Sequence, residues 1–217
     1  MASKKLINAA AVFGSAAGTE SGTDVPKAAD FDASRVISGG ANVDVAGKGV
    51  KISAPSTTSN TNALQYLVKT ITAGPNGWQA TAHIHRFTPQ DSWAMMGMIL
   101  RDSVSGKSKT MGMGADGTWG FIRNNFSSDT AWDAANGVCA YYNLDFWLRV
   151  VDDLTNQTWF LSPDGENWQK FYVEARAYYV LPKQVGVFIN PNMGGAYAGL
   201  KGVEIGMVVK SFKLEQL

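Results

Sequence analysis

The sequence predicts an all-β protein, an antiparallel β-sandwich with an extended N-terminal arm. From Leu64 onward, short strand-like runs recur at the spacing of a sandwich or jelly roll. Turn-forming pairs such as Asp116-Gly117 and Asp164-Gly165 separate these runs. No long segment has helical periodicity. The chain has 217 residues and is 45% apolar, which is enough for one sizeable core.

Residues 1–58 differ from the rest because they are rich in Gly, Ala, Ser and Thr and poor in large apolar side chains. Two stretches in this region, SAAGTESGTD and SAPSTTSNTN, have the composition of linkers. Between them, RVISGGANVDVAGKGVKISA indicates short hairpins. Such a segment buries too little surface to offset its ordering entropy alone. We therefore predict an assembly arm over 1–58, held by a sister subunit or a larger assembly, or else packed back on its own domain.

The first residues, MASKKLINAAAVFGSAAG, imitate a secretion signal, but Asn8 interrupts a short apolar stretch, so we predict that they are not one. No run approaches the roughly 20 apolar residues of a membrane-spanning helix. The net charge is +1, with scattered Lys and Arg and no basic run. A phosphate-binding surface needs clustered positive charge, so we predict neither a nucleic-acid nor a membrane partner.

Residues 59–217 are expected to form the sandwich, in which Asp and Gly separate the short strand-like runs. The predicted strands are 64–71, 77–87, 93–103, 108–116, 118–125, 138–143, 146–153, 158–165, 168–175, 184–190 and 202–214. Trp78, Trp147 and Trp159 sit in apolar alternation and are predicted to pack in the core.

The stretch FLSPDGENWQKF is predicted to be a hairpin turn rather than a working site. Pro163 presets φ, Gly165 accepts a positive φ, and Asp164 is expected to bond its own backbone two residues on. Trp168 then returns to the sheet and is expected to pack on Trp159 or Phe160. The alternative is that Asp164 and Trp168 grip a ligand.

Four groups of residues in order resemble concanavalin A-like lectin and glucanase sandwich domains, in particular the bacterial branch found beside glycosidases. They are Gly97, Arg101, Asp102 and Ser103; Trp147 and Arg149; Ser162, Asp164, Gly165 and Trp168; and Gly186. The resemblance covers roughly residues 62 to 215. It implies a jelly-roll fold and often carbohydrate contact, but it fixes no function because this fold hosts lectins, enzymes and structural modules.

The sequence does not favour an enzyme. A glycosidase needs two carboxylates flanking the scissile bond. Glucan-cutting enzymes of the resembled fold commonly carry Glu-x-Asp-x-x-Glu on one strand, and that spacing is absent here. Asp152 and Asp153 are adjacent, so on a strand they point to opposite faces.

His83 and His85 alternate in AHIHRF and share one face, which suits a metal or a general base, although no acidic or Cys residue is near them in sequence. An exposed sheet face is the alternative. Asn143 to Asp145 and Asp129 to Asp133 offer oxygen ligands for calcium, but no Asp-x-Asp-x-Asp-Gly loop occurs. We predict no metal and no cofactor.

Aromatic residues beside polar loops are the candidate binding residues, because sugars stack on exposed rings while amides and carboxylates bond their hydroxyls. Trp132 lies near Asn124 and Asp133, and Tyr197 lies near Asn192 in a Gly-rich loop. We predict that these five residues bind a glycan or a protein partner.

These observations lead to two functional hypotheses. In the first, the chain is a non-enzymatic, homo-oligomeric structural protein of a bacteriophage virion (a head decoration, fibre or tail appendage). Residues 1–58 would then dock on other virion proteins, and the sandwich would be displayed to cell-surface glycans. The alternative is a stand-alone or secreted carbohydrate-binding module, extracellular or at the cell surface.

Overall fold

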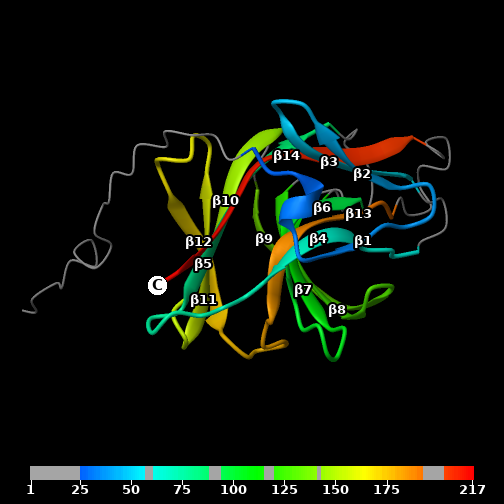
Figure 1. Ribbon diagram of the computed structural model, residues 1–217. Coiled ribbons are helices and arrows are strands. Elements are labelled where there is room, and N and C mark those ends of the chain that lie inside the picture. The colour runs from blue at the N-terminus through cyan, green and yellow to red at the C-terminus, as the bar shows by residue number, and fades with distance from the viewer. Residues whose placement is uncertain (1–24, 57–60, 88–93, 115–119, 141–142, 193–202) are drawn as a thin grey trace, which may run out of the picture.

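The structure is a computed structural model that describes residues 25–56, 61–87, 94–114, 120–140 (for 136–140 the backbone alone), 143–192 and 203–217. These residues form two antiparallel seven-stranded sheets that face each other (Figure 1). The predicted β-sandwich is therefore confirmed. The helical element of the described residues is the 3₁₀ turn η2 (Ala28–Asp30), and no described helix is long and apolar enough to cross a membrane.

The strand order of each sheet follows from the antiparallel pairings. Sheet A runs in the order β1 (Ala33–Arg35), β4 (Gln65–Thr70), β13 (Gln184–Asn190), β6 (Met95–Arg101), β7 (Ser108–Gly114), β8 (Gly120–Ser128) and β9 (Ala131–Ala140). Sheet B runs in the order β12 (Gln169–Ala175), β11 (Asn156–Ser162), β10 (Asp145–Asp152), β5 (Trp78–Arg86), β14 (Glu204–Gln216), β3 (Gly49–Pro55) and β2 (Ala41–Val45).

The main core lies between the sheets and follows the period of two that a strand imposes. Along β5, Trp78, Ala80, Ala82 and Ile84 are fully buried, while the residues between them point outward. Trp159 on β11 is also fully buried, so the predictions for Trp78 and Trp159 are confirmed. Each fully buried large apolar side chain contributes about 1.5–3 kcal/mol.

Residues 25–56 belong to the sandwich, which corrects the predicted boundary at residue 58. β3 lies between β14 and β2, and its Val50, Ile52 and Ala54 are buried in the main core. β1 pairs with β4 at the edge of sheet A. The boundary was misplaced because the alternation in β3 is short and flanked by Gly-rich sequence, and because one of its two partner strands is the distant β14. The remainder of the predicted arm, 1–24, lies outside the described residues.

The eleven predicted strands correspond to β4 through β14, but β9 begins earlier than expected. A tight turn after β8 lets Trp132 pair with Phe126, and Ala135 with Asn124. Trp132 therefore lies on a strand and not in a loop.

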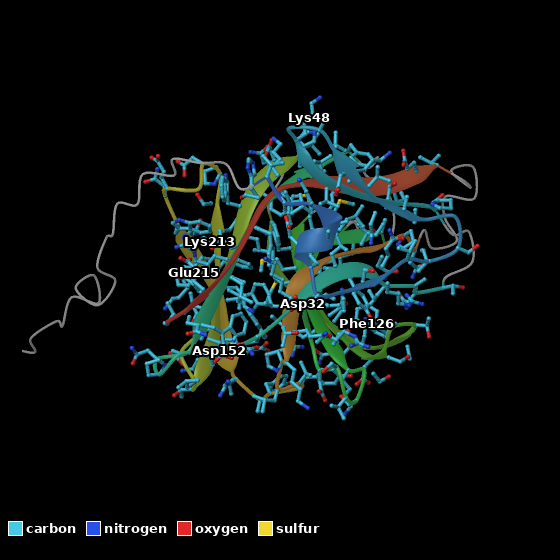
Figure 2. The ribbon with its side chains drawn as sticks, in the orientation of Figure 1. Asp32, Lys48, Phe126, Asp152, Lys213 and Glu215 are labelled. Atoms are coloured by element: carbon cyan, nitrogen blue, oxygen red, sulfur yellow. The ribbon has the colours of Figure 1, made fainter. Side chains whose placement is uncertain are left out.

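The outer face of sheet A, which points away from sheet B, carries a second apolar cluster. Its members alternate with main-core residues along the strands and are all buried: Leu64, Tyr66, Val68, Met95, Ile99, Ile122, Phe126 and Phe188. Figure 2 labels Phe126 at the lower right, over the green strands β7 and β8.

Sheet A curls toward this outer side. The Leu64 amide donates a hydrogen bond to the carbonyl of Asp129 in the β8–β9 turn (2.9 Å), although three strands separate β4 from β8 in the sheet. Gly97 and Gly112 pair across β6 and β7, and a Cβ on Gly112 would lie 2.3 Å from the Met96 carbonyl oxygen. Only glycine fits this close approach, and the curl brings the β8–β9 hairpin beside β4.

Candidate functional site

Trp132 is the most exposed tryptophan among the described residues, with 52% of its surface accessible. Its Nε1–H donates a hydrogen bond to Asn124 Oδ1 at 3.1 Å. Asn124 in turn donates through Nδ2 to Met95 Sδ at 2.7 Å. These bonds orient the indole on the outer side of sheet A. The structure therefore brings together Trp132 and Asn124, two of the residues that the sequence singled out.

Asp133 does not share this surface. It follows Trp132 along β9, so its side chain points to the opposite side of sheet A. There its carboxylate lies beside the Tyr179 hydroxyl, and burial together with this negative neighbour raises the pKa of Tyr179 to about 12. Asp133 therefore faces the β12–β13 connection and not a ligand on Trp132.

Asn192 does not lie on the surface beside Trp132 either. It is buried, and its Nδ2 donates to Asn62 Oδ1 at 3.1 Å. The same oxygen accepts a bond from Asn190 Nδ2 at 2.8 Å, so three amides link the chain before β4 to the end of β13. Tyr197 lies outside the described residues.

The β8–β9 turn is anchored by a carboxylate that serves two arginines. Asp129 lies 3.6 Å from Arg35 Nε and 3.7 Å from Arg101 Nε, and it accepts a hydrogen bond from the Tyr66 hydroxyl at 3.3 Å. Burial raises the pKa of Tyr66, and the charge of Asp129 adds to the rise. These contacts tie the hairpin that carries Trp132 to β1, β4 and β6.

An ionic network occupies the space between the sheets on the side of β9 and β12. Lys109 and Glu174 form a buried ion pair, and Arg123 Nη2 lies 3.0 Å from the same carboxylate. Asp152, which is fully buried, pairs with Arg176 Nε at 2.9 Å. Both carboxylates are engaged by cations inside the molecule, which leaves neither of them free at the surface as a general acid.

The two histidines lie on the outer face of sheet B, where Asp145 of β10 stands opposite His85. The Asp145 carboxylate bonds His83 Nε2 through Oδ1 and His85 Nδ1 through Oδ2, the latter at 3.3 Å. Lys210 of β14 also donates to this carboxylate. The His83 ring stacks on Trp147, with centroids 4.2 Å apart and an interplanar angle of 13°.

The location of Trp147 contradicts the prediction that it packs in the core. On β10 the buried positions are taken by Phe146, Leu148 and Val150, so Trp147 and Arg149 alternate to the outer face and are half-buried. The run FWLRVV has apolar residues in both registers up to Arg149, and only the charge of Arg149 indicates which register faces outward.

The charge state of the histidine cluster follows from burial and from Lys210. Burial lowers the pKa of His83, and its bond to Asp145 offsets only part of that shift. Burial would raise the pKa of Asp145, but hydrogen bonds from Lys210 and His83 outweigh it and hold that pKa below its usual range. Within the described part of the chain, no group of three or more His, Cys, Asp or Glu side chains is arranged to hold a metal ion.

The predicted turn after β11 is present, and Asp164 bonds its own backbone two residues on, as expected. Asp164 Oδ1 accepts the backbone N–H groups of Glu166 (2.9 Å) and Asn167 (2.8 Å), and bonds from the side chain and backbone of Asn167 lower the pKa of Asp164. Gly165 has φ +81° and lies against the Trp147 ring, where a Cβ would come within 2.8 Å of a ring atom. The turn thus folds over the outer face of sheet B.

Of the two partners predicted for Trp168, the structure contradicts Trp159. Trp159 points into the core, whereas Trp168 lies under the Arg149 guanidinium, 3.8 Å from the ring centre. Its Nε1–H donates to the Gly165 carbonyl at 2.9 Å. Arg149 Nε–H donates to Thr81 Oγ1 at 3.0 Å.

Sequence reasoning missed the partners on this face, because Asp145 and Arg149 on β10 and Lys210 on β14 are far along the chain from the histidines on β5. The histidine alternation was a usable signal for one strand. The neighbouring strands that complete the cluster follow only from the pairing of β5 with β10 and β14.

No family model matches the sequence, and no curated protein matches it. Among solved structures, the chain is similar to a functionally unknown protein from Saccharomyces cerevisiae (13% identity, TM-score 0.54), with 83% of this chain and 97% of that one covered. It is also similar to a bifunctional GH43-CE protein from Bacteroides eggerthii (13%, TM-score 0.54; 82% of this chain, 22% of that one). A third neighbour is the Ca²⁺/Man2-bound exoplasmic/lumenal domain of VIP36 (11%, TM-score 0.51; 82% and 79%).

The fold is a lectin-like, concanavalin A-like β-sandwich. At these identities the likeness shows the fold alone. The chain spans about a fifth of the Bacteroides protein that it matches.

Proposed function

We propose that this sandwich binds carbohydrate without cleaving it, with Trp132 as the stacking ring. The observation that carries the proposal is the exposed indole of Trp132, held in place by Asn124. A pyranose presents apolar C–H faces that pack on an aromatic ring, and large exposed aromatic side chains mark interaction sites. A ring fixed before binding loses less side-chain entropy when the ligand arrives.

The proposal of a non-catalytic role rests on the described carboxylates. A glycosidase needs two carboxyl groups on either side of the scissile bond, one of them free to donate a proton. Asp152 and Glu174 are bonded to cations between the sheets, and Asp145 is bonded to Lys210. None of these carboxylates lies on the outer face of sheet A beside Trp132.

The test is a glycan array with the whole chain, followed by calorimetric titration of the strongest ligand. Trp132→Ala is expected to weaken binding at least tenfold, because the stacking contact between sugar and ring is lost while the half-exposed site leaves the fold intact. Tyr178→Ala is the matched control, since Tyr178 is also an exposed aromatic residue but lies in the β12–β13 connection. An array without any ligand, or equal affinities of the Trp132 variant and the wild type, overturns the proposal.

A second candidate function is a structural component of a larger particle, such as a bacteriophage virion, with the N-terminal residues as the anchor. The composition of 1–24, which lie before the sandwich, supports it. The deletion that tests this proposal must end at residue 24, because removing 1–58 also removes β3 from the core. Light scattering is expected to find a defined oligomer for the full chain and a monomer for 25–217. Monomers in both cases contradict self-assembly through the N-terminus.

A further inference from the structure

One row of side chains crosses the outer face of sheet B from β12 to β14. Directly paired residues point to the same side of a sheet. The pairings Lys170–Phe160, Phe160–Arg149, Arg149–Thr81 and Thr81–Lys213 therefore align five side chains across five strands. Figure 2 labels Lys213 on the red C-terminal strand, and its neighbours Phe212 and Leu214 pack into the core, so Lys213 points outward.

The row carries a cation on every second strand. Neighbouring strands lie about 4.8 Å apart, so Lys170, Arg149 and Lys213 are spaced by roughly 10 Å. A linear ligand lying across the strands would meet these cations one after another.

The carboxylates of this face are already engaged by lysines. Asp145 is bonded to Lys210, and Glu215 lies 2.7 Å from Lys213. By contrast, no carboxylate oxygen of the described residues lies within 4 Å of a side-chain nitrogen of Arg149 or Lys170. The face therefore carries positive charge that the described part of the protein does not balance.

Arg149 is the centre of this excess charge. It is half-buried, and burial lowers its pKa, which means that its charged form is held at a cost in solvation. Its guanidinium lies over the Trp168 ring and its Nε–H donates to Thr81 Oγ1, which leaves its terminal N–H groups without a hydrogen bond to the described residues. The charge of Glu215 reaches Arg149 and offsets part of the effect of burial, but no carboxylate of the described residues forms an ion pair with it. A half-buried arginine without a direct ion-pair partner is suited to bind an anionic group of a ligand.

Aromatic rings lie beside the row. Trp147 lies two residues before Arg149 on β10, and its side chain is on the same face of the sheet. His83 stacks against its ring and Gly165 lies close to it. Phe160 is part of the row itself. The outer face thus combines ordered cations with half-buried rings, whereas nucleic-acid binding without sequence preference needs open ring faces for successive bases.

We propose that the outer face of sheet B binds a linear acidic polysaccharide, with Arg149 and Lys170 bonding its carboxylate or sulfate groups and Phe160, between them in the row, contacting its sugar rings. This site lies on the opposite sheet from Trp132 and goes beyond the proposed function. It does not depend on the role of Trp132.

The test uses the full chain and measures its affinity for polygalacturonate and for dextran sulfate at low and high salt. Binding is expected and weakens as salt rises, because the contacts are between partly exposed charges. Arg149→Gln is expected to weaken binding about tenfold, since it removes a charged hydrogen-bond donor. Arg149→Lys keeps the charge but loses the flat guanidinium, and an intermediate loss is expected. Lys170→Gln is expected to cost about threefold.

Two control variants distinguish binding at this face from a general charge effect and from binding at Trp132. Lys48→Gln removes the same charge from the β2–β3 turn, at the top of Figure 2, and is expected to leave the affinity unchanged. Trp132→Ala is also expected to leave the affinity unchanged. The proposal for the outer face of sheet B is therefore tested independently of the proposal for Trp132. The proposal is overturned if neither acidic polymer binds, if Lys48→Gln weakens binding as much as Arg149→Gln, or if single-stranded oligo(dT) binds as tightly as the polysaccharides. The polymer bound more tightly identifies the anionic group.

Discussion

The outer face of sheet A is apolar and buried, whereas the outer face of sheet B is charged, aromatic and half-exposed. On sheet A, Phe188 and Phe126 lie in a second apolar cluster under the curl of the sheet. On sheet B, the corresponding outward positions carry Trp147, Arg149 and His83. The comparison shows that a side chain facing away from the main core is not always exposed to solvent. Whether it meets water depends on how far its sheet curls.

Glycine explains why the two sheets differ. Gly186 lies in the middle of sheet A, and a Cβ there would come within 1.9 Å of the Leu67 carbonyl oxygen on the neighbouring strand. Together with Gly97 and Gly112 it allows the close strand approach that the curl requires. The sheet-B strands β10 and β11, in contrast, contain no glycine. Among the described residues, sheet A exposes Trp132 at its rim, whereas sheet B has a broad, half-exposed outer face.

Gly186→Ala is expected to have the largest effect on the fold. The added methyl must displace backbone, not a movable side chain, so the free energy of unfolding is expected to fall by about 4 kcal/mol or more. Urea denaturation measures it. Gly47→Ala is the matched control, because Gly47 has φ +68° but open space around its Cβ, and it is expected to cost only about 1–2 kcal/mol. Equal costs would mean that close strand approach does not limit sheet A.

A pair of aromatic truncations tests the contrast between the faces directly. Phe188→Ala empties a fully buried site on the outer side of sheet A and is expected to cost about 3–5 kcal/mol. Trp147→Ala removes a larger ring from sheet B, yet water already reaches part of it, and a cost of about 1–2 kcal/mol is expected. Thermal or urea unfolding of both variants gives the comparison. If the Trp147 variant loses as much stability as the Phe188 variant, the outer face of sheet B is a second core and not a surface.

The sequence predicted the sandwich and the order of its later strands, because period-two alternation and turn pairs are local signals. It did not predict that β3 is a core strand, since Val50 and Ile52 have polar partners on the neighbouring β2 and acquire apolar partners from β14 at the other end of the chain. It also assigned Trp147 to the core, because apolar residues precede and follow this tryptophan, so the sequence does not show which side of the strand faces the core. The curl of sheet A depends on the register that places Gly97 opposite Gly112 and Gly186 between Val68 and Ile99, and the sequence alone does not give that register.

The residues of the candidate sites also differ in how far they could be predicted from the sequence. Trp132 and Asn124 are eight residues apart and meet across one hairpin, so sequence proximity predicted their contact. Asp133 was grouped with them by proximity alone, and strand alternation turns it to the other side. The Arg149 row and the Asp145 cluster cross several strands, and only the registers of β5, β10 and β14 assemble them.

The smallest expected effect concerns the pH dependence of the histidine cluster. Because burial lowers the pKa of His83 below its ordinary value of 6.5, the unfolded chain takes up this proton at a higher pH than the folded one. The stability is therefore complete above about pH 7 and falls as the pH drops from 6.5 through the folded-state pKa of His83. A separate loss follows below pH 3.8, as Asp145, whose pKa is held low, takes up its proton.

His83→Asn is expected to remove the first of these losses and to keep the part of the second that depends on Lys210. Melting temperatures at closely spaced pH values from about 7 to about 5 measure the slope, with the wild type alongside. Asp145→Asn is expected to act in the opposite direction. Its carboxylate is the group that partly offsets burial in setting the pKa of His83, so without it that pKa falls further and the loss on acidification grows. An unchanged slope in the His83 variant would show that another group is responsible, and that the outer face of sheet B does not respond to pH through this ring.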